Sequence, residues 1–311
     1  MSASWVAAGV RARALSRRRV GAAGARDLAA LPSLDAAVQA LVATPYGHDV
    51  HPGMTLAQAQ HAVSATVLWH LRVLAGWLPH GDARIVRVLA GGFEVANVDE
   101  HLRSMAGLPA GPTFELGSLS TAWPRIAAEH SREGIRAVLA ASPWGDPGDD
   151  APRMLHLGMR VAWLLRVGAN VPAARPWAHG AAAILVAREC MAAGTRPGPE
   201  LSRGIDLLVG RGWRDARLGT LAEALPSADR WALADVSEPA DLWRAEAAWW
   251  RRVSTDAATL LRKPVSGPDP VVGAVGALGA DAWRVRAALE VAARAGTGSG
   301  TIAREAFDAV A

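Results

Sequence analysis

Three short segments of the sequence contain residue types that can bind ions or phosphate. GHDVH at 47–51 places two histidines around an aspartate, as at a transition-metal site. DPGDD at 146–150 offers carboxylates for calcium, and GTGSG at 296–300 has the glycines of a phosphate-binding loop. The first has no third ligand nearby, the second lacks EF-hand spacing, and the third has no preceding strand or following Gly-Lys-Ser/Thr. We therefore expect solvated loops, no metal site and no cofactor.

The sequence also offers no arrangement typical of an enzyme. No paired carboxylates, activated nucleophile or cofactor loop can be recognised, so we expect a non-catalytic protein. Cys190 is the only cysteine, which excludes an internal disulfide and a thiolate zinc site and is typical of a reducing compartment. Because Cys190 lies in an alanine-rich segment, we expect it to act as a small buried apolar residue.

Arginines gather at the N-terminus, ahead of the first acidic residue, Asp27. They allow three interpretations: a solvated helix face, a contact with an acidic protein or with lipid headgroups, and a nucleic-acid contact. We place the last behind the others, because the net charge is only +4 and no recognition motif occurs, although the pI is about 10.3. The candidate contact residues are Arg11, Arg13, Arg17, Arg18 and Arg19.

One stretch of sequence occurs twice. SLDAAVQALVATPYG begins at Ser33, and SREGIRAVLAASPWG begins at Ser131. Serine is a preferred N-cap, and the acid two residues later complements the helix dipole. Proline then forces the preceding residue into an extended conformation, and the glycine allows a turn that returns the aromatic side chain to the helix. The pattern predicts a cap–helix–turn module whose shared positions are Ser33, Pro45, Tyr46 and Gly47, and Ser131, Pro143, Trp144 and Gly145.

A weaker third copy begins at Ser227 and has Pro239 at the proline position, but it lacks the aromatic and the glycine. A second motif recurs between the modules at 91–107, 174–194 and 267–296, each copy an arginine-bearing helix that ends at a glycine. In the first of these copies we single out Asn97 and Arg103 as contact residues. Three units of nearly a hundred residues are too long for a solenoid repeat and indicate three similar helical domains.

Helical periodicity dominates the rest of the chain. One apolar stripe runs from Leu56 to Leu78 after a Thr55 cap. A second helix is expected over 153–167, with Asp150 as its cap and Gly168 as its end, and a third begins near Asp241. The best strand candidate is RIVRV at 84–88, but alternation is otherwise rare, and the sequence predicts an all-α fold. No apolar run reaches the roughly 20 residues that a membrane-spanning helix needs, and no secretory signal is recognisable.

The order of these motifs resembles the C-subunit family of the V/A-type (vacuolar-type) rotary ATPases, which is related to the d-subunit of the eukaryotic membrane sector. VRARALSRRR (10–19) is similar to the family's opening helix, and LVATPYG to its Leu-x-x-Thr-x-Tyr phrase. NVDEHLRSMAG followed by LGSLS (116–120) resembles the family's Asn-containing helix and next phrase. The segment from Gly267 to Gly296 and TIAREAF (301–307) resemble the closing helices. The chain departs from the family at Val275, Ala282 and Val285, where Tyr, Glu and Asn are usual.

The resemblance implies a funnel of three pseudo-threefold-related helical repeat domains, expected at 1–80 (with the closing C-terminal helices near it), 81–170 and 171–311. It also implies a cytoplasmic, peripheral and non-catalytic socket between the central stalk and the membrane proteolipid ring, serving ATP-coupled proton or sodium transport. The expected partners are the other ATPase subunits and not nucleic acid. The alternative, taken from the residues alone, is an all-α nucleic-acid- or anion-binding protein that uses the arginine-rich N-terminus.

Overall fold

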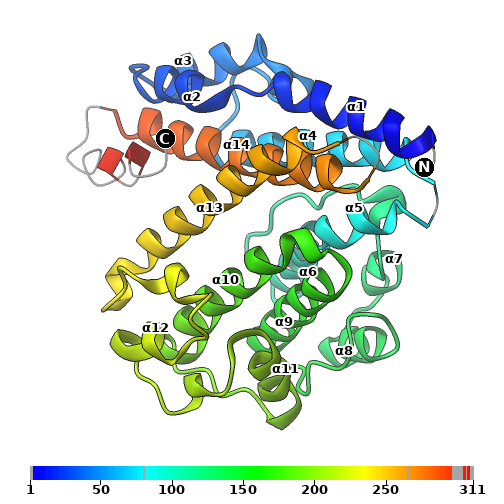
Figure 1. Cartoon of the computed structure of the whole chain (residues 1–311), viewed down its shortest axis with the longest axis vertical. Helices are drawn as coiled ribbons and strands as arrows, with labels where there is room; N and C mark the ends of the chain where they lie inside the picture. The colour runs from blue at the N-terminus through cyan, green and yellow to red at the C-terminus, as the bar shows by residue number, and fades with distance from the viewer. Residues whose placement is uncertain (1–2, 80, 265–266, 296–303, 306, 309–311) are drawn as a thin grey trace. The chain divides into compact units, whose positions relative to one another are not determined.

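The computed structural model describes residues 3–79, 81–264, 267–295, 304–305 and 307–308. All the regular elements within these ranges are helical, which confirms the all-α prediction. The chain divides into two compact units (Figure 1): unit 1 contains 1–83 and 250–311, and unit 2 contains 84–249. The N-terminal and C-terminal segments therefore fold together in unit 1.

Unit 1 is built around its last long helix, α14, which packs against α1, α2, α3 and α4 (Figure 1). Most of α14 is buried, and its glycines and alanines let neighbouring helices approach closely. At Gly273, for example, a Cβ atom would lie 2.9 Å from the carbonyl oxygen of Ala257 in α13. The elements of unit 1 are α1 (Ala3–Arg17), α2 (Gly21–Ala29), α3 (Leu34–Val42), η1 (Pro45–His48), α4 (Leu56–Gly76), the second part of α13 (Leu242–Arg262) and α14 (Asp269–Ala293).

Unit 2 is organised around α9, against which α5, α6, α10 and α11 pack. The helix α10 continues into a π-helical turn, η4. The elements of unit 2 are α5 (Arg84–Leu89), α6 (Gly91–Met105), η2 (Gly117–Leu119), α7 (Trp123–Ile126), α8 (Arg132–Ala140), α9 (Pro152–Asn170), η3 (Pro172–Ala174), α10 (Arg175–Leu185), η4 (Val186–Ala192), α11 (Pro199–Val209), η5 (Gly212–Arg214), η6 (Leu218–Thr220), α12 (Leu221–Ala224), η7 (Arg230–Leu233), η8 (Pro239–Asp241) and the first part of α13.

Capping residues in the sequence predicted the starts of two long helices correctly. Thr55 caps α4 in a capping box: its hydroxyl accepts from the backbone N–H of Gln58, and the Gln58 side chain accepts from the N–H of Thr55. The helix expected near Asp241 is α13, which begins at Leu242. The carboxylate of Asp241 accepts the backbone N–H groups of Ser237 and Glu238 just before it.

Three local expectations were wrong. The strand candidate at 84–88 is helical, in α5, where Val86 and Val88 are buried and the helix packs against α9. Asp150 does not cap α9: Ala151 occupies that position, and Asp149 accepts the backbone N–H of Ala151. The same helix continues past Gly168 to Asn170, because a glycine permits a helix end but does not impose one.

The unit boundary at 83/84 lies close to the expected domain boundary at 80/81. The expected boundary at 170/171 lies inside unit 2, at the end of α9. The arrangement of the chain as three repeat domains stays a prediction. Of the closing TIAREAF segment, residues 301–303 and 306 lie outside the described residues.

Three helices carry a glycine where a tryptophan ring packs directly on the backbone. A Cβ atom on Gly92 of α6 would lie 2.7 Å from the Trp163 ring, and one on Gly279 of α14 would lie 3.3 Å from the Trp250 ring. On Gly180 of α10 it would lie 2.7 Å from Trp231 and 3.0 Å from Trp249. The recurring helices 91–107, 174–194 and 267–296 thus share a glycine that accommodates an indole.

We expect Gly180→Ala to destabilise the protein by about 1–3 kcal/mol, because the added methyl group overlaps both indole rings. Gly168→Ala is the matched control: nothing lies within 4 Å of its Cβ position, and alanine is the better helix former by about 0.5–1 kcal/mol. Thermal unfolding followed by circular dichroism compares the two. Equal midpoints for the two variants would contradict this packing.

Candidate functional site

The two copies of the module form the same structure. Ser33 caps α3 and accepts the backbone N–H of Ala36 at 3.2 Å, and Ser131 caps α8 and accepts that of Gly134 at 3.0 Å. Each serine has extended backbone angles, and each helix is 9 residues long. The cap–helix part of the prediction is therefore confirmed in both copies.

The second half of the module is also repeated. Thr44 donates its hydroxyl to the carbonyl of Leu41 and accepts the backbone N–H of Tyr46; Ser142 does the same with Leu139 and Trp144. This hydroxyl bridge closes the turn across Pro45 in one copy and across Pro143 in the other.

The glycines at the end of the two modules are needed for different reasons. Gly145 has a φ of 77°, in the left-handed region that favours glycine. At Gly47, by contrast, a Cβ atom would overlap the carbonyl oxygen of Val42 at 2.1 Å.

Each aromatic side chain donates a hydrogen bond to a buried carboxylate. The Tyr46 hydroxyl donates to Asp281 Oδ2 at 2.9 Å, and Trp144 Nε1 donates to Glu94 Oε1 at 3.0 Å. Both carboxylates are only 1% exposed. Arg166 lies over the Trp144 ring at 4.8 Å from its centre, within cation–π range.

The same two carboxylates hold the start of the helix that precedes each module. Asp281 accepts the backbone N–H groups of Val20 and Gly21 at the start of α2. Glu94 accepts those of Thr121 and Ala122, both at 2.6 Å, at the start of α7. A negative charge is favourable at this end of a helix. Each carboxylate thus joins a helix start, an aromatic turn and its own helix, α14 or α6.

Sequence reasoning missed Asp281 and Glu94, although a signal was present. Both follow the glycine that receives a tryptophan ring, as Gly92-Phe-Glu94 and as Gly279-Ala-Asp281. The corresponding triplet in the third recurring helix is Gly180-Ala-Ala182, which has no acid. The three helices were matched in the sequence by their arginines and terminal glycines, and these residues do not form the acid–aromatic hydrogen bond.

The third module is not built like the first two. Ser227 lies in a turn and no α-helix follows it directly, and Pro239 begins the 3₁₀ turn η8. The expectation of a serine-capped helix there was wrong: Ser227 and Asp229 lie in one turn, and Asp229 pairs with His179 at 3.1 Å. Both the aromatic of the turn and the acid of the central helix are missing from this copy.

Asn97 is not a contact residue for a partner, because it is fully buried. Its side-chain amide donates to the carbonyl of Phe114 and accepts the N–H of the same residue, which fixes the loop after α6. Arg103 is half-exposed and donates twice to the carbonyl of Pro109. Within the chain the two residues hold one loop in place, and the role of the half-exposed Arg103 as a contact residue stays a prediction.

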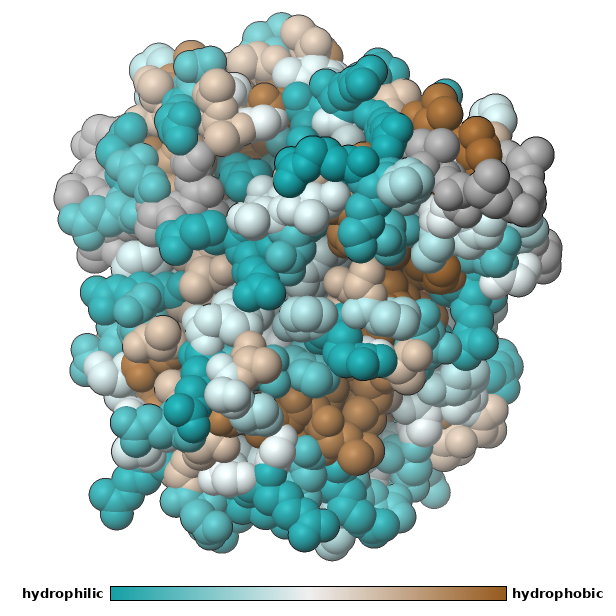
Figure 2. Space-filling view, in the orientation of Figure 1, coloured by the Kyte–Doolittle hydropathy of each residue, from teal (hydrophilic) through white to brown (hydrophobic). Residues whose placement is uncertain are grey.

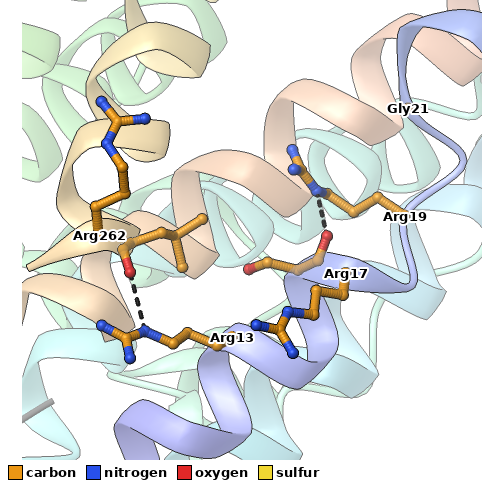
Figure 3. A pocket seen from close by; sticks show the side chains of 7 residues that line it. Arg13, Arg17, Arg19, Gly21 and Arg262 are labelled. Carbon is orange, nitrogen blue, oxygen red and sulfur yellow. Dashed lines mark hydrogen bonds between the residues drawn. The ribbon is translucent and has the colours of Figure 1, made fainter.

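Three of the N-terminal arginines lie together around an open cleft of about 730 Å³, and two lie elsewhere. Arg13, Arg17 and Arg19 line the cleft together with Arg262 from the end of α13 (Figure 3). Arg11 stacks over Trp77 at 5.8 Å, and Arg18 lines a small separate cavity next to His70. The sequence could not predict Arg262 as a neighbour, because it lies more than 240 residues away along the chain.

Two of the other candidate segments have structural roles, and the third, GTGSG at 296–300, lies outside the described residues. His48 pairs with Asp49 at 2.9 Å and stacks on Trp69, and Asp146 pairs with Arg136. Within the described ranges, no three His, Cys, Asp or Glu side chains are grouped in a way that could hold a metal ion. Cys190 is half-buried, and burial raises the pKa of its thiol to about 11, which disfavours the reactive thiolate.

Burial raises the pKa of Tyr46 well above its usual 10.0, and the negative charge of Asp281 is the second cause. Tyr46 is the only tyrosine, so its ionisation can be followed by tyrosinate absorbance. We expect the folded protein to show no tyrosinate at a pH where the unfolded chain is half ionised. Because the unfolded state loses the proton first, this residue's contribution to stability is complete below pH 10 and declines above it. Titration of a native tyrosine near pH 10 without unfolding would contradict the buried hydrogen bond.

For the second copy, we expect Trp144→Phe to lower the free energy of unfolding by about 2 kcal/mol, because it removes a hydrogen bond to a buried charge. Trp77→Phe, at a half-exposed site, is the control and should change it by less than about 1 kcal/mol. Urea unfolding measures both. Combining Trp144→Phe with Glu94→Gln should lower the free energy of unfolding by less than the sum of the two single changes. Strict additivity would argue against the hydrogen bond between the two side chains.

A comparison of the chain with protein-family models found no match, and neither did a comparison with curated proteins. Among the described helices, none is both long enough and apolar enough to cross a membrane.

Proposed function

We propose that this chain is the non-catalytic C-subunit of a V/A-type rotary ATPase, a socket that couples the central stalk to the membrane proteolipid ring. The observation that supports the proposal best is the duplicated module, in which an aromatic turn is fixed to a buried carboxylate of a central helix. A repeated, tightly fixed helical unit suits a torque-transmitting part, and two of the motifs that resemble the family, LVATPYG and NVDEHLRSMAG, lie on the first module and on α6.

Stiffness follows from how the modules are held. Each carboxylate accepts three hydrogen bonds in a buried setting, where such bonds are strong and leave few alternative arrangements. The indole–glycine contacts remove free space between the helices. A close-packed interior of this kind transmits strain and resists deformation.

We extend the proposal to three pseudo-threefold-related repeats arranged as a funnel. The central helices would be α14, α6 and α10, each marked by a glycine under a tryptophan ring. In this scheme α6 precedes the module to which it supplies Glu94. The helix α14 supplies the equivalent carboxylate, Asp281, to the module near the N-terminus. The third repeat, around α10, keeps the glycine and has lost the acid–aromatic pair.

In this role the chain lies at the cytoplasmic face of the membrane as a peripheral component, and the exposed arginines near the end of α1 are available for acidic partners. The alternative, an anion-binding protein, is supported by one specific observation, the arginine-lined cleft.

The test uses the chain in its own cells. We expect the tagged protein, isolated with membranes, to co-purify with the stalk and ring proteins of a rotary ATPase in fixed proportion, as measured by mass spectrometry. In membrane vesicles from cells that lack the chain, ATP hydrolysis should no longer drive proton or sodium uptake, and the restored gene should recover it.

Arg132→Gln is a suitable control, since Arg132 is an exposed arginine on α8, outside the cleft. It should restore uptake fully, whereas Tyr46→Phe combined with Trp144→Phe should assemble but move fewer ions per ATP. Ion uptake that is normal without the chain, or recovery of the tagged protein free of every rotary ATPase component, would sink the proposal.

A further inference from the structure

The cleft beside α1 is a concentration of positive charge that the chain does not neutralise. Arg13 and Arg17 lie one turn apart on α1, Arg19 lies in the turn before α2, and Arg262 ends α13 (Figure 3). The other lining residues are Ser16, Gly21 and Leu261, so the described lining contains no acidic side chain. None of the four arginines forms an ion pair with an acid of the described chain.

Two of these guanidinium groups are held in place by backbone carbonyls. Arg13 donates from Nε to Leu261 at 3.0 Å and from Nη2 to Lys263, and Arg19 donates from Nε to Ser16 at 2.7 Å. Their remaining N–H groups stay available. Because these two guanidinium groups are already ordered, their side chains lose less conformational entropy when an anion binds.

The side chains of the other two arginines do not hold any other described segment of the chain in place. Arg17 is exposed, and no hydrogen bond or ion pair of its side chain occurs in the described chain; Arg262 donates only to Thr259, one turn back on the same helix. Two acids near the cleft are engaged elsewhere. Asp269 is paired with Lys263, and the buried carboxylate of Asp281 accepts three hydrogen bonds from Val20, Gly21 and Tyr46.

We infer that this cleft binds a small anion that carries two or more phosphate groups. Guanidinium groups form paired hydrogen bonds with phosphate oxygens, and arginines on both α1 and α13 suit a ligand with more than one phosphate. The volume is within the range of small-ligand pockets, about 300–1,000 Å³. Hydrophilic residues cover much of the surface around α1 and the end of α13, which favours a charged ligand over an apolar one (Figure 2). The inference does not depend on the proposed ATPase role.

The test is isothermal titration of the purified full-length chain with pyrophosphate at low ionic strength. We expect binding that weakens as salt is added, because the contacts are partly exposed. Arg17→Gln combined with Arg262→Gln should weaken it about a hundredfold or more, since each change removes charge-assisted bonds worth about tenfold. Arg132→Gln removes the same charge outside the cleft and should bind like the wild type. Circular dichroism should show unchanged unfolding for all variants, because neither cleft residue secures the backbone.

A second arm separates the sources of the phosphate. Sedimentation with vesicles that contain a phosphoinositide, against vesicles of phosphatidylcholine alone, tests a lipid headgroup. Binding of pyrophosphate alone supports a free ligand, and binding of the phosphoinositide vesicles alone supports a lipid, provided that Arg17→Gln with Arg262→Gln abolishes it. No binding in either arm, or equal binding by the double variant, overturns the inference. Either result leaves the membrane-complex test above independent, since that test needs no anion.

Discussion

Burying a charged carboxylate is costly unless hydrogen bonds or an opposite charge compensate it, and in each unit of this chain one buried carboxylate joins three elements through such bonds. Asp281 meets it with two backbone N–H groups at the start of α2 and the hydroxyl of Tyr46. Glu94 meets it with two N–H groups at the start of α7 and the indole of Trp144. Without these partners either ion would be left unpaired in the core, which is among the most destabilising arrangements available to a protein.

This requirement explains why unit 1 is built from both ends of the chain. The N-terminal module needs an acid at the start of α2, and no acidic residue of its own segment supplies it; α14 supplies Asp281 from the far end of the sequence. In unit 2 the corresponding acid precedes its module directly, on α6. The same assembly is thus made once from a continuous stretch and once by closing the chain on itself. Such closure brings the end of α13 next to α1 and thereby creates the arginine cleft.

What the sequence could predict depends on the range of the interaction. Ser33, Ser131 and Thr55 were predicted as caps because a cap is decided within four residues, and the stripe of α4 follows from helical periodicity alone. Arg262 was missed because its neighbours in the cleft lie more than 240 residues away along the chain, beyond any local rule. Asp281 was marked only by the glycine two residues before it, and its partners also lie more than 200 residues away. Asn97 was misjudged for the opposite reason, because its partner is close along the chain. A polar side chain is usually exposed, but the amide oxygen and nitrogen of Asn97 both form hydrogen bonds with the backbone of Phe114, so the side chain can be buried.

The segment that begins at Ser227 contains neither part of this assembly. At the position of Glu94 and Asp281, counted from the shared glycine, α10 has Ala182, and the turn near Pro239 has no aromatic. An acid without its donor would be a buried unpaired charge, whereas a donor without its acid would be a buried unpaired N–H or O–H, so losing either alone is unfavourable. With neither present, no buried donor or acid of this pair is left unpaired. Asp229 pairs with His179, and the segment after Ser227 forms turns and the 3₁₀ helices η7 and η8. The acid and the aromatic therefore act as one unit in the two modules that the structure shows.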